Sequence, residues 1–310
     1  MRLFKKYTIE SDTNDLKWIV LNDPTPDALN HLKKNYKFHK LDIEDCLSKA
    51  QRSKIDEYPN YLFSVLNIPI RKNSEKEIEK SQIYFFLGKN FVITIHDNDK
   101  HILNLEKRLK TNKKLKANHM GGSPSYLLYM IIDGLFESVL PLLDDMQEDL
   151  FELEHEIFDN SSSTDKLKDI LALKKDIINF RRIILPERTL VVELDHKSRK
   201  YDGEGLEVYF DDIVDKVEKI WNNLENMNEI LVSLFETNES LTSHNTNNTI
   251  KMLTIFSVLI MPMTLITGFY GMNVKGLPLA EHPLSTLVIS LGFVFLALLM
   301  ITFFRWKKWI

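Results

Sequence analysis

Two long apolar runs near the end of the chain dominate its pattern of hydrophobic and polar positions. The first covers residues 250–269 and contains one charged residue, Lys251, whereas the second covers residues 284–304 and contains none. A helix of about 20 apolar residues crosses the roughly 30 Å hydrocarbon core of a bilayer. Two adjacent runs of this length are rarely helices of a soluble core, so the pattern predicts a transmembrane hairpin over residues 250–310.

The charges beside the second run predict its orientation. The segment Arg305–Trp309 has three cations and two aromatic residues, and cationic flanks favour the cytoplasmic side. Because two spans return the chain to its starting side, we expect a multi-pass protein of the cell (inner or plasma) membrane with both termini in the cytoplasm. Only Tyr270–Pro283 would face outside. The single cysteine, Cys46, and a start without an apolar stretch agree with this expectation.

Upstream of these runs, residues 1–120 alternate short β-rich segments with helical ones. Runs of β-branched and aromatic residues occur at Trp18–Leu21, Tyr61–Ile68, Ser81–Leu87 and Phe91–His96, and the last two flank a turn at Gly88 that is typical of a hairpin. We therefore predict an α/β cytoplasmic domain with a partly antiparallel sheet. A basic and then glycine-rich stretch at residues 113–124 indicates the boundary of this domain.

Residues 121–202 have helical periodicity and predict an acidic helical hairpin. One helix is expected over residues 125–158, then a break at Asn160–Ser163 and a second helix from Thr164 towards Lys200, with a joint at Pro186. Acidic residues crowd the second half of the first helix, at Asp144, Asp145, Glu148, Asp149, Glu152, Glu154 and Glu156. A run of charge of this kind is typical of a solvated helix face.

The helical pattern resumes at Glu204 and continues into the first apolar run, so residues 203–249 are predicted to form a stalk helix. A single helix from Glu204 to Phe269 would be about 100 Å long. Its apolar stripe includes Val208, Ile213, Val217, Ile220, Leu224, Met227, Ile230, Leu234 and Leu241. Packing against copies of itself would cover such a stripe, so we expect a homo-oligomer with its stalk helices side by side around an axis.

One face of the first apolar run is small or weakly polar and has no ionisable group. Residues three and four positions apart share this face, which Leu253 borders, and they are Asn247, Ile250, Thr254, Ser257, Met261, Thr264 and Gly268. Such a face is typical of helix packing in membranes, and it is equally suited to the wall of a pore. From these residues alone both interpretations stay open.

The end of the first run, Tyr270-Gly271-Met272-Asn273, resembles the GMN signature of the CorA-type magnesium channels. The preceding residues match the pattern N-x-x-x-K-x-L-T…P-x-T of that family at Asn247, Lys251, Leu253, Thr254, Pro262 and Thr264. Residues 43–61 and 208–213 also look like segments of this family, so the resemblance covers nearly the whole chain. It implies a CorA-like homopentameric funnel, with an α/β cytoplasmic domain, a long-helix stalk and two transmembrane α-helices.

The resemblance also implies roles for individual residues. Gly271, Met272 and Asn273 would form the selectivity filter, in which a ring of Asn273 carboxamides recognises a hydrated ion. The implied pore-lining residues are Asn247, Ile250, Leu253, Ser257, Met261 and Thr264, with Ile250 and Leu253 as the apolar constriction. Glu44 and Asp45 would share a regulatory metal ion with Asp212 of the neighbouring subunit. Loss of that ion would let like charges repel and the subunits separate.

These residues lead us to expect a Mg²⁺ uptake channel that moves hydrated divalent cations down their electrochemical gradient and is gated by cytoplasmic Mg²⁺. Co²⁺ and Ni²⁺ are further candidate ions. One alternative is a Zn²⁺ or Co²⁺/Ni²⁺ transporter of the same fold, because the loop after the signature has only Glu281 as an acid, opposed by Lys275, and resembles loops of a zinc-transporting branch. Met272 argues against that branch. A non-conducting, membrane-anchored helical scaffold is the alternative from another class.

The sequence argues against other classes of protein. Its histidines are scattered singly, and no glycine-rich phosphate loop follows a predicted strand, so we expect neither an enzyme nor an ATP-driven pump. The chain has 40 Lys and Arg against 44 Asp and Glu residues, a formal net charge of −4. This balance gives no reason to expect a nucleic-acid partner. The expected partners are the lipid bilayer and other copies of the chain.

Overall fold

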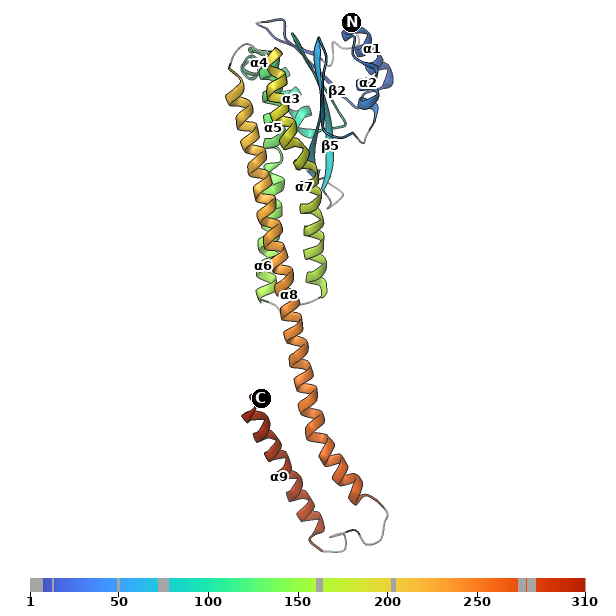
Figure 1. Ribbon diagram of the computed structural model, residues 1–310, viewed down its shortest axis with the longest axis vertical. Helices are drawn as coiled ribbons and strands as arrows, with labels where there is room; N and C mark the ends of the chain where they lie inside the picture. Colours follow the sequence, from blue (N-terminus) through green and yellow to red (C-terminus); the bar gives the residue numbers. More distant parts are fainter. Residues whose placement is uncertain are drawn as a thin grey trace. The chain divides into compact units, whose positions relative to one another are not determined.

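The computed structural model divides the chain into two compact units, which are described separately below (Figure 1). The first unit consists of Met1–Glu156 and Thr164–Phe235, and the second of Ile157–Ser163 and Glu236–Ile310. Within these units the structure describes residues 8–12, 14–48, 51–71, 78–159, 164–201, 205–272, 277 and 283–309. The predicted break at Asn160–Ser163 lies outside the described residues, as does Glu204.

A six-stranded sheet forms the centre of the first unit, with the strand order β1-β2-β6-β5-β4-β3. The strands are β1 (Thr8–Glu10), β2 (Lys17–Asn22), β3 (Lys54–Glu57), β4 (Tyr61–Arg71), β5 (Ile78–Gly88) and β6 (Phe91–His96). Only β2 and β6 pair in parallel, and the other neighbours are antiparallel. This arrangement confirms the predicted α/β domain and its hairpin, in which Gly88 pairs with Phe91.

Helices cover both faces of this sheet, and Figure 1 shows α1 and α2 on one side and α3, α5 and α7 on the other. Their bounds are α1 (Pro26–Tyr36), α2 (Lys40–Leu47), α3 (Lys100–Thr111), α4 (Lys113–Met120), α5 (Pro124–Glu137), α6 (Leu140–Asp159) and α7 (Thr164–Ser198). Leu29 and Leu32 of α1 and Ile43 of α2 pack on Phe63 and Phe86 in one apolar core. Because both faces are covered, the central strands are buried along nearly their whole length.

One prediction for the helical part needs correction. The expected single helix over residues 125–158 is broken at Ser138 and Val139, between α5 and α6. Pro141 explains the break, because it lacks an N–H and its ring would clash with the carbonyl of Glu137, where α5 ends. The stretch at residues 113–124, where the domain boundary is predicted, contains the helix α4, whose last residues, His119 and Met120, are buried. Pro186 lies inside α7, which is assigned as one helix.

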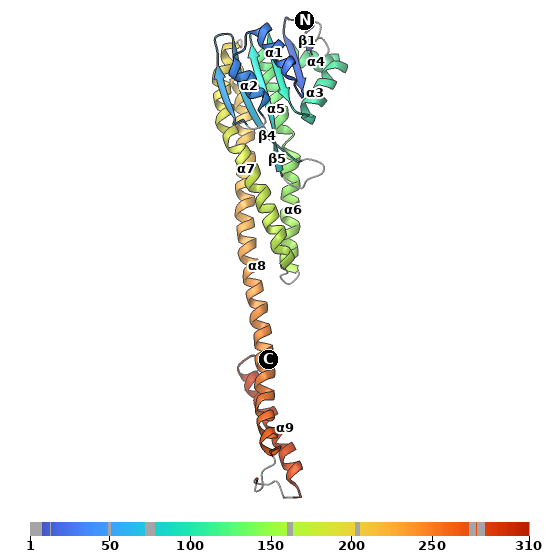
Figure 2. The ribbon, with the colours of Figure 1, turned by 90° about the vertical axis from the view of Figure 1, so that its right-hand side faces the viewer.

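The predicted long helix is confirmed as α8 (Glu207–Tyr270), a single helix of 64 residues. Its beginning belongs to the first unit, where Figures 1 and 2 show it side by side with α6 and α7. Arg188 and Arg181 of α7 pair with Glu218 and Glu225 of α8, and both guanidinium groups lie over the ring of Trp221.

This packing corrects in part the prediction that copies of the chain cover the apolar stripe of the stalk. Ile213, Val217, Ile220, Leu224 and Leu234 are already buried within the single chain, whereas Val208 and Ile230 are 76% and 41% exposed. The argument for an oligomer therefore depends mainly on the later part of α8.

Among the described residues, three helical stretches are long and apolar enough to cross a membrane by length and composition, namely Pro124–Phe158, α8 and Thr286–Trp306 of α9 (Ser285–Trp306). The most apolar 18-residue segments of α8 and α9 are 0% and 6% buried, whereas the corresponding segment of Pro124–Phe158 is 44% buried. Leu128, Ile131 and Ile132 of α5 are fully buried, and α5 packs on β5 and β6. Packing inside the first unit thus accounts for the apolar character of the additional stretch, which the sequence analysis assigned to the helical hairpin.

Candidate ion pathway and regulatory site

The predicted pore-lining side chains are exposed along the second part of α8. They are Asn247, Ile250, Leu253, Ser257, Met261 and Thr264. Steps of three or four residues place them along one face of the helix, over about 25 Å. Leu253 and Met261 are 62% and 75% exposed, although they are large and apolar. Apolar side chains exposed to this degree need cover from lipid or from another chain.

Threonine hydroxyls on this part of α8 hydrogen bond along the helix itself. Thr254 donates to the carbonyl oxygen of Ile250 at 2.7 Å, and Thr264 donates to that of Ile260 at 3.0 Å. Because each hydroxyl hydrogen is used in this way, the hydroxyl oxygen offers only its lone pairs to other groups. An accepting oxygen suits the outward-pointing hydrogens of the water shell around a cation.

The end of α8 explains the glycine of the GMN signature. The Gly271 amide donates to the carbonyl oxygen of Thr267 at 2.8 Å, and a Cβ added to Gly271 would lie 2.9 Å from that same oxygen. A side chain at this position would therefore collide with the backbone of the last helical turn. Met272 follows as an exposed side chain. Asn273 lies outside the described residues, as do Lys275 and Glu281 of the following loop.

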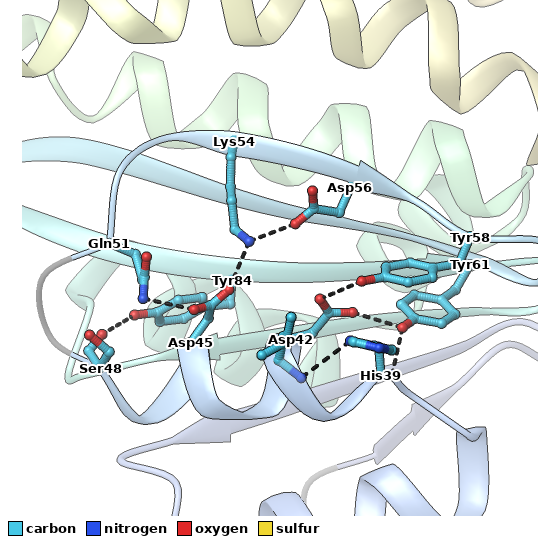
Figure 3. Close-up of polar contacts among 11 residues, drawn as sticks. His39, Asp42, Asp45, Ser48, Gln51, Lys54, Asp56, Tyr58, Tyr61 and Tyr84 are labelled. Atoms are coloured by element: carbon cyan, nitrogen blue, oxygen red, sulfur yellow. Dashed lines mark hydrogen bonds and ion pairs between the residues drawn. The ribbon is translucent and has the colours of Figure 1, made fainter.

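The candidate regulatory residue Asp45 already has two partners within its own chain (Figure 3). Its Oδ2 lies 2.7 Å from Nζ of Lys54, and its Oδ1 accepts from Nε2 of Gln51 at 2.8 Å. Nζ of Lys54 lies 2.6 Å from Oδ2 of Asp56 as well. Burial alone would lower the pKa of Lys54, but its hydrogen bonds to Asp45 and Asp56 outweigh that effect and raise the pKa.

A second carboxylate, Asp42, fixes the helix that carries Asp45. Asp42 is buried, and it accepts hydrogen bonds from the hydroxyls of Tyr58 at 2.9 Å and Tyr61 at 2.7 Å. Burial raises the pKa of Asp42, and these two hydrogen bonds oppose the shift. Burial and the contact with Asp42 also raise the pKa of Tyr58 to about 12, so this hydroxyl remains a donor. The Asp42 contacts hold α2 against the β3–β4 region.

The other predicted regulatory residues lie apart from this network. Glu44 is exposed and pairs with Lys40 at 3.1 Å one turn away, a surface pair of low energy. Asp212 is exposed on α8. The first part of this helix lies on the opposite side of the sheet from α2 (Figure 1). Among the described residues, no group of three or more His, Cys, Asp and Glu side chains is arranged to hold a metal ion.

A metal ion that uses both Asp45 and Asp212 would therefore have to lie between two copies of the chain. Carboxylate oxygens are hard ligands of the kind that Mg²⁺ prefers, so the chemistry of the donors fits this ion. Both oxygens of Asp45 have partners, however, and a bound cation has to displace Lys54 or share Asp45 with it.

Lys54, Gln51 and Glu187 have no role predicted from the sequence alone. Glu187 of α7 is fully buried, and its Oε1 accepts from the Ser53 hydroxyl and from the backbone amide of Asn67. Burial raises the pKa of Glu187 to about 8. The burial of Glu187 could have been predicted from its position in the sequence. Glu187 lies three residues after Ile184 and four before Val191, and both of these belong to the apolar stripe of α7.

Comparisons with known proteins place the chain among related sequences. The model of the CorA-like Mg2+ transporter protein family matches residues 13–307. The cobalt/magnesium transport protein CorA of Thermotoga maritima is 26% identical over 316 residues, which cover 100% of this chain and 89% of that protein. The protein of the same name from Methanocaldococcus jannaschii is 26% identical over 301 residues, which cover 95% of this chain and 92% of that protein.

The fold is similar as well. The complete structure of the CorA magnesium transporter from Methanocaldococcus jannaschii superposes with a TM-score of 0.82 at 23% identity and covers 97% of this chain and 94% of its own. That likeness supports the predicted fold, an α/β domain with a long helix and two C-terminal apolar helices. Since the family model matches nearly the whole length, from the first strands to the end of α9, the chain belongs to the CorA-like Mg2+ transporter family.

Proposed function

We propose that the chain forms a Mg²⁺ uptake channel that moves hydrated divalent cations down their electrochemical gradient. The observation that carries this proposal is the exposed face of α8. On this face the hydroxyl oxygen of Thr264 is free to accept hydrogen bonds, and Gly271 follows about two turns later at the end of the helix. A divalent cation that crosses a potential of about 100 mV gains roughly 4 to 5 kcal/mol, so uptake needs no second energy source. Co²⁺ is a second candidate cargo, because two relatives are named cobalt/magnesium transport proteins. Ni²⁺ is a third.

The pore requires several copies of α8 around an axis, and we propose a homopentamer. The exposed apolar side chains of the second part of α8 support an assembly. In it Asn247 and Thr264 form polar rings, Ile250 and Leu253 form an apolar constriction that excludes water, and Asn273 forms the outer selectivity ring with Gly271 and Met272. Ser257 and Met261 line the wall between the constriction and Thr264.

The proposed topology has two membrane spans, α8 from about residue 250 and α9, with both termini in the cytoplasm. The cations at Arg305, Lys307 and Lys308 beside α9 support this orientation. By role, residues 1–120, 121–202 and 203–249 are then the cytoplasmic domain, the acidic hairpin and the stalk. Cytoplasmic Mg²⁺ held by Glu44 and Asp45 with Asp212 of the neighbouring subunit stabilises the closed state, because without the ion these carboxylates repel each other.

Ion flux into vesicles tests the proposal. Purified protein is reconstituted, and uptake of Mg²⁺, Co²⁺, Ni²⁺ and Zn²⁺ is compared at an imposed negative interior potential. We expect Mg²⁺ uptake, and we expect Asn273→Ala to abolish it while assembly stays intact, because alanine has no carboxamide to meet the hydrated ion. The matched control is Asn222→Ala, an exposed asparagine of the stalk.

Each alternative predicts a different result in the same experiment. Uptake of Zn²⁺ without Mg²⁺ would favour the zinc transporter, although zinc prefers imidazole or thiolate ligands and residues 250–272 and 283–309 contain neither histidine nor cysteine. No flux of any cation by correctly assembled wild-type protein would favour the membrane-anchored scaffold. Normal Mg²⁺ flux by Asn273→Ala would exclude the proposed filter.

A further inference from the structure

The ammonium group of Lys54 lies between two carboxylates from different elements (Figure 3). It is 2.7 Å from Asp45 of α2 and 2.6 Å from Asp56 of β3. Lys54 and Asp56 are two residues apart on one strand, so their side chains share a face of the sheet. Asp56 is therefore an acceptor that stays beside Lys54, whatever happens at Asp45.

Both sides of the contact between Asp45 and Lys54 are held in place. The pairing of β3 with β4 aligns Lys54 with Val65 and Asp56 with Phe63, and Nζ of Lys54 lies 5.4 Å from the centre of the Phe63 ring. On the other side, the hydrogen bonds of Asp42 fix α2. The ammonium group thus meets Asp45 as a preformed pair, with little side-chain freedom left to lose.

A divalent cation and Lys54 compete for the same carboxylate. The Asp45 side chain is 18% exposed, and Lys54 and Gln51 each bind one of its oxygens. A cation that approaches Asp45 meets the positive charge of Lys54 within a few ångströms, where the repulsion between charges is strong and only weakly screened. Movement of Lys54 away from Asp45, with Asp56 as its remaining partner, lowers this repulsion and leaves the ammonium group paired.

We propose that Lys54 is a tethered competitor of the regulatory cation at Asp45, and that it transfers fully to Asp56 when a divalent cation binds. This inference rests on the proposed function, in which Asp45 senses cytoplasmic Mg²⁺. It adds a residue that sets the working range of the sensor. Without the divalent cation, Asp45 and Asp56 share Lys54, and the three groups together keep a net negative charge. Displacement of Lys54 costs energy, and this cost lowers the affinity of the Asp45 site for Mg²⁺. The site therefore fills only at a higher Mg²⁺ concentration.

The test measures Mg²⁺ binding by full-length protein in detergent, independently of flux. The Mg²⁺ concentration for half-maximal protection from limited proteolysis, and that for half-maximal thermal stabilisation, are compared in wild type and Lys54→Met at constant ionic strength. We expect both concentrations to fall about tenfold in Lys54→Met, because the competitor is gone. Lys54→Arg keeps the cation and should stay within about twofold of wild type.

Two controls separate competition from a general effect of charge or from damage to the fold. Lys89→Met removes an exposed cation at the β5–β6 turn and should leave both concentrations unchanged. Lys54→Gln removes the charge but keeps a hydrogen-bond donor, and it should reproduce the fall if Lys54→Met is poorly folded. If Lys54→Met or Lys54→Gln folds and its half-maximal Mg²⁺ concentrations are unchanged or higher than in wild type, the inference is wrong.

Asp56 gives an independent arm of the test. Asp56→Asn removes the second acceptor, so displacement of Lys54 from Asp45 costs more, and the half-protecting Mg²⁺ concentration should rise several-fold. In the Lys54→Met background, Asp56→Asn should have a much smaller effect, because no ammonium group needs a place to go. Equal effects in both backgrounds would show that Asp56 acts only through its own charge, and the transfer to Asp56 would be wrong.

Failure of this inference can be told apart from failure of the proposed function. If Asp45→Asn abolishes the Mg²⁺ response while Lys54→Met leaves it unchanged, the sensor stands and the competition does not. If wild type conducts Mg²⁺ but shows neither protection nor stabilisation by Mg²⁺, regulation at Asp45 is excluded and the inference falls with it. If wild type conducts no cation at all, the channel itself is excluded.

Discussion

Glu187 of α7 accepts a hydrogen bond from the backbone amide of Asn67 on β4 at 3.1 Å. β3 pairs with β4 only as far as Lys54 and Val65, so the amide of Asn67 lies just beyond the end of the ladder. A carboxyl group on a helix therefore satisfies a donor at the sheet edge that no strand reaches. Burial of this carboxyl raises its pKa to about 8, and the group is largely protonated at neutral pH.

The raised pKa of Glu187 predicts a stability that falls as pH rises. In the unfolded chain Glu187 has a pKa near 4.5, and below this pH it is protonated in both the folded and the unfolded protein. There its contribution to the free energy of unfolding is fully present. Between about pH 4.5 and 8 the unfolded state loses its proton first, so the free energy of unfolding decreases, by up to about 4 kcal/mol. We expect Glu187→Gln to remove this slope. Thermal midpoints of both proteins from pH 5 to 8 test it, and parallel curves would contradict it.

The close contact at Gly271 predicts that Gly271→Ala disrupts the end of α8. The added Cβ would lie 2.9 Å from the Thr267 carbonyl oxygen, so the last turn, which leads into the proposed filter, must shift. We expect at least a tenfold loss of Mg²⁺ flux with normal assembly. Gly292→Ala on α9 is the control, because apart from the nearby backbone of its own helix its Cβ would meet nothing within 4 Å in the single chain. Equal losses in both variants would argue against the steric explanation.

The hydroxyl of Thr264 predicts a specific effect on a hydrated cargo. Thr264→Val keeps the shape of the side chain but replaces an accepting oxygen with a methyl group. We expect about a tenfold lower Mg²⁺ flux, the size that loss of one hydrogen bond to a charged ligand shell gives. Thr302→Val changes a threonine of α9 that also donates along its helix, to Leu298 at 2.7 Å, and should leave flux unchanged.

The proposed regulatory site predicts a loss of inhibition when its carboxylates are neutralised. In Asp45→Asn with Asp212→Asn, flux should no longer fall as internal Mg²⁺ rises, because neither the bound ion nor the repulsion that follows its loss remains. Five sites of only about 1 kcal/mol each would together change the closed-to-open ratio by roughly 10⁴-fold. Flux assays at graded internal Mg²⁺, with proteolysis of the stalk in parallel, measure both effects.

Retained inhibition in that double variant would place the sensor elsewhere. The acidic surface from Asp144 to Glu156 on α6 is the next candidate. A partial loss would be expected if Glu44 holds part of the ion, and Glu44→Gln added to the double variant should then complete the loss.

The sequence by itself determined the elements whose signal is local. The two apolar runs predicted the second part of α8 and all of α9, because length and lack of charge suffice to identify such helices. Strands β2, β4, β5 and β6 followed from runs of β-branched and aromatic residues, and the hairpin at Gly88 followed from its turn. The GMN signature and the segments around it predicted the family, since a motif with fixed spacing survives at low overall identity.

Only the tertiary structure decided which side chains meet across the sequence. It showed that most of the apolar stripe of α8 up to Leu234 is buried within the single chain, so this part of the stripe needs no second copy of the chain. It also paired Asp45 with Lys54 and buried Glu187 against Asn67, which are 120 residues apart. Periodicity states that a residue faces inward or outward, but the partner of a charged group is set by the packing of distant elements. Those partners decide whether a carboxylate is a free metal ligand, an occupied one or a neutral acid.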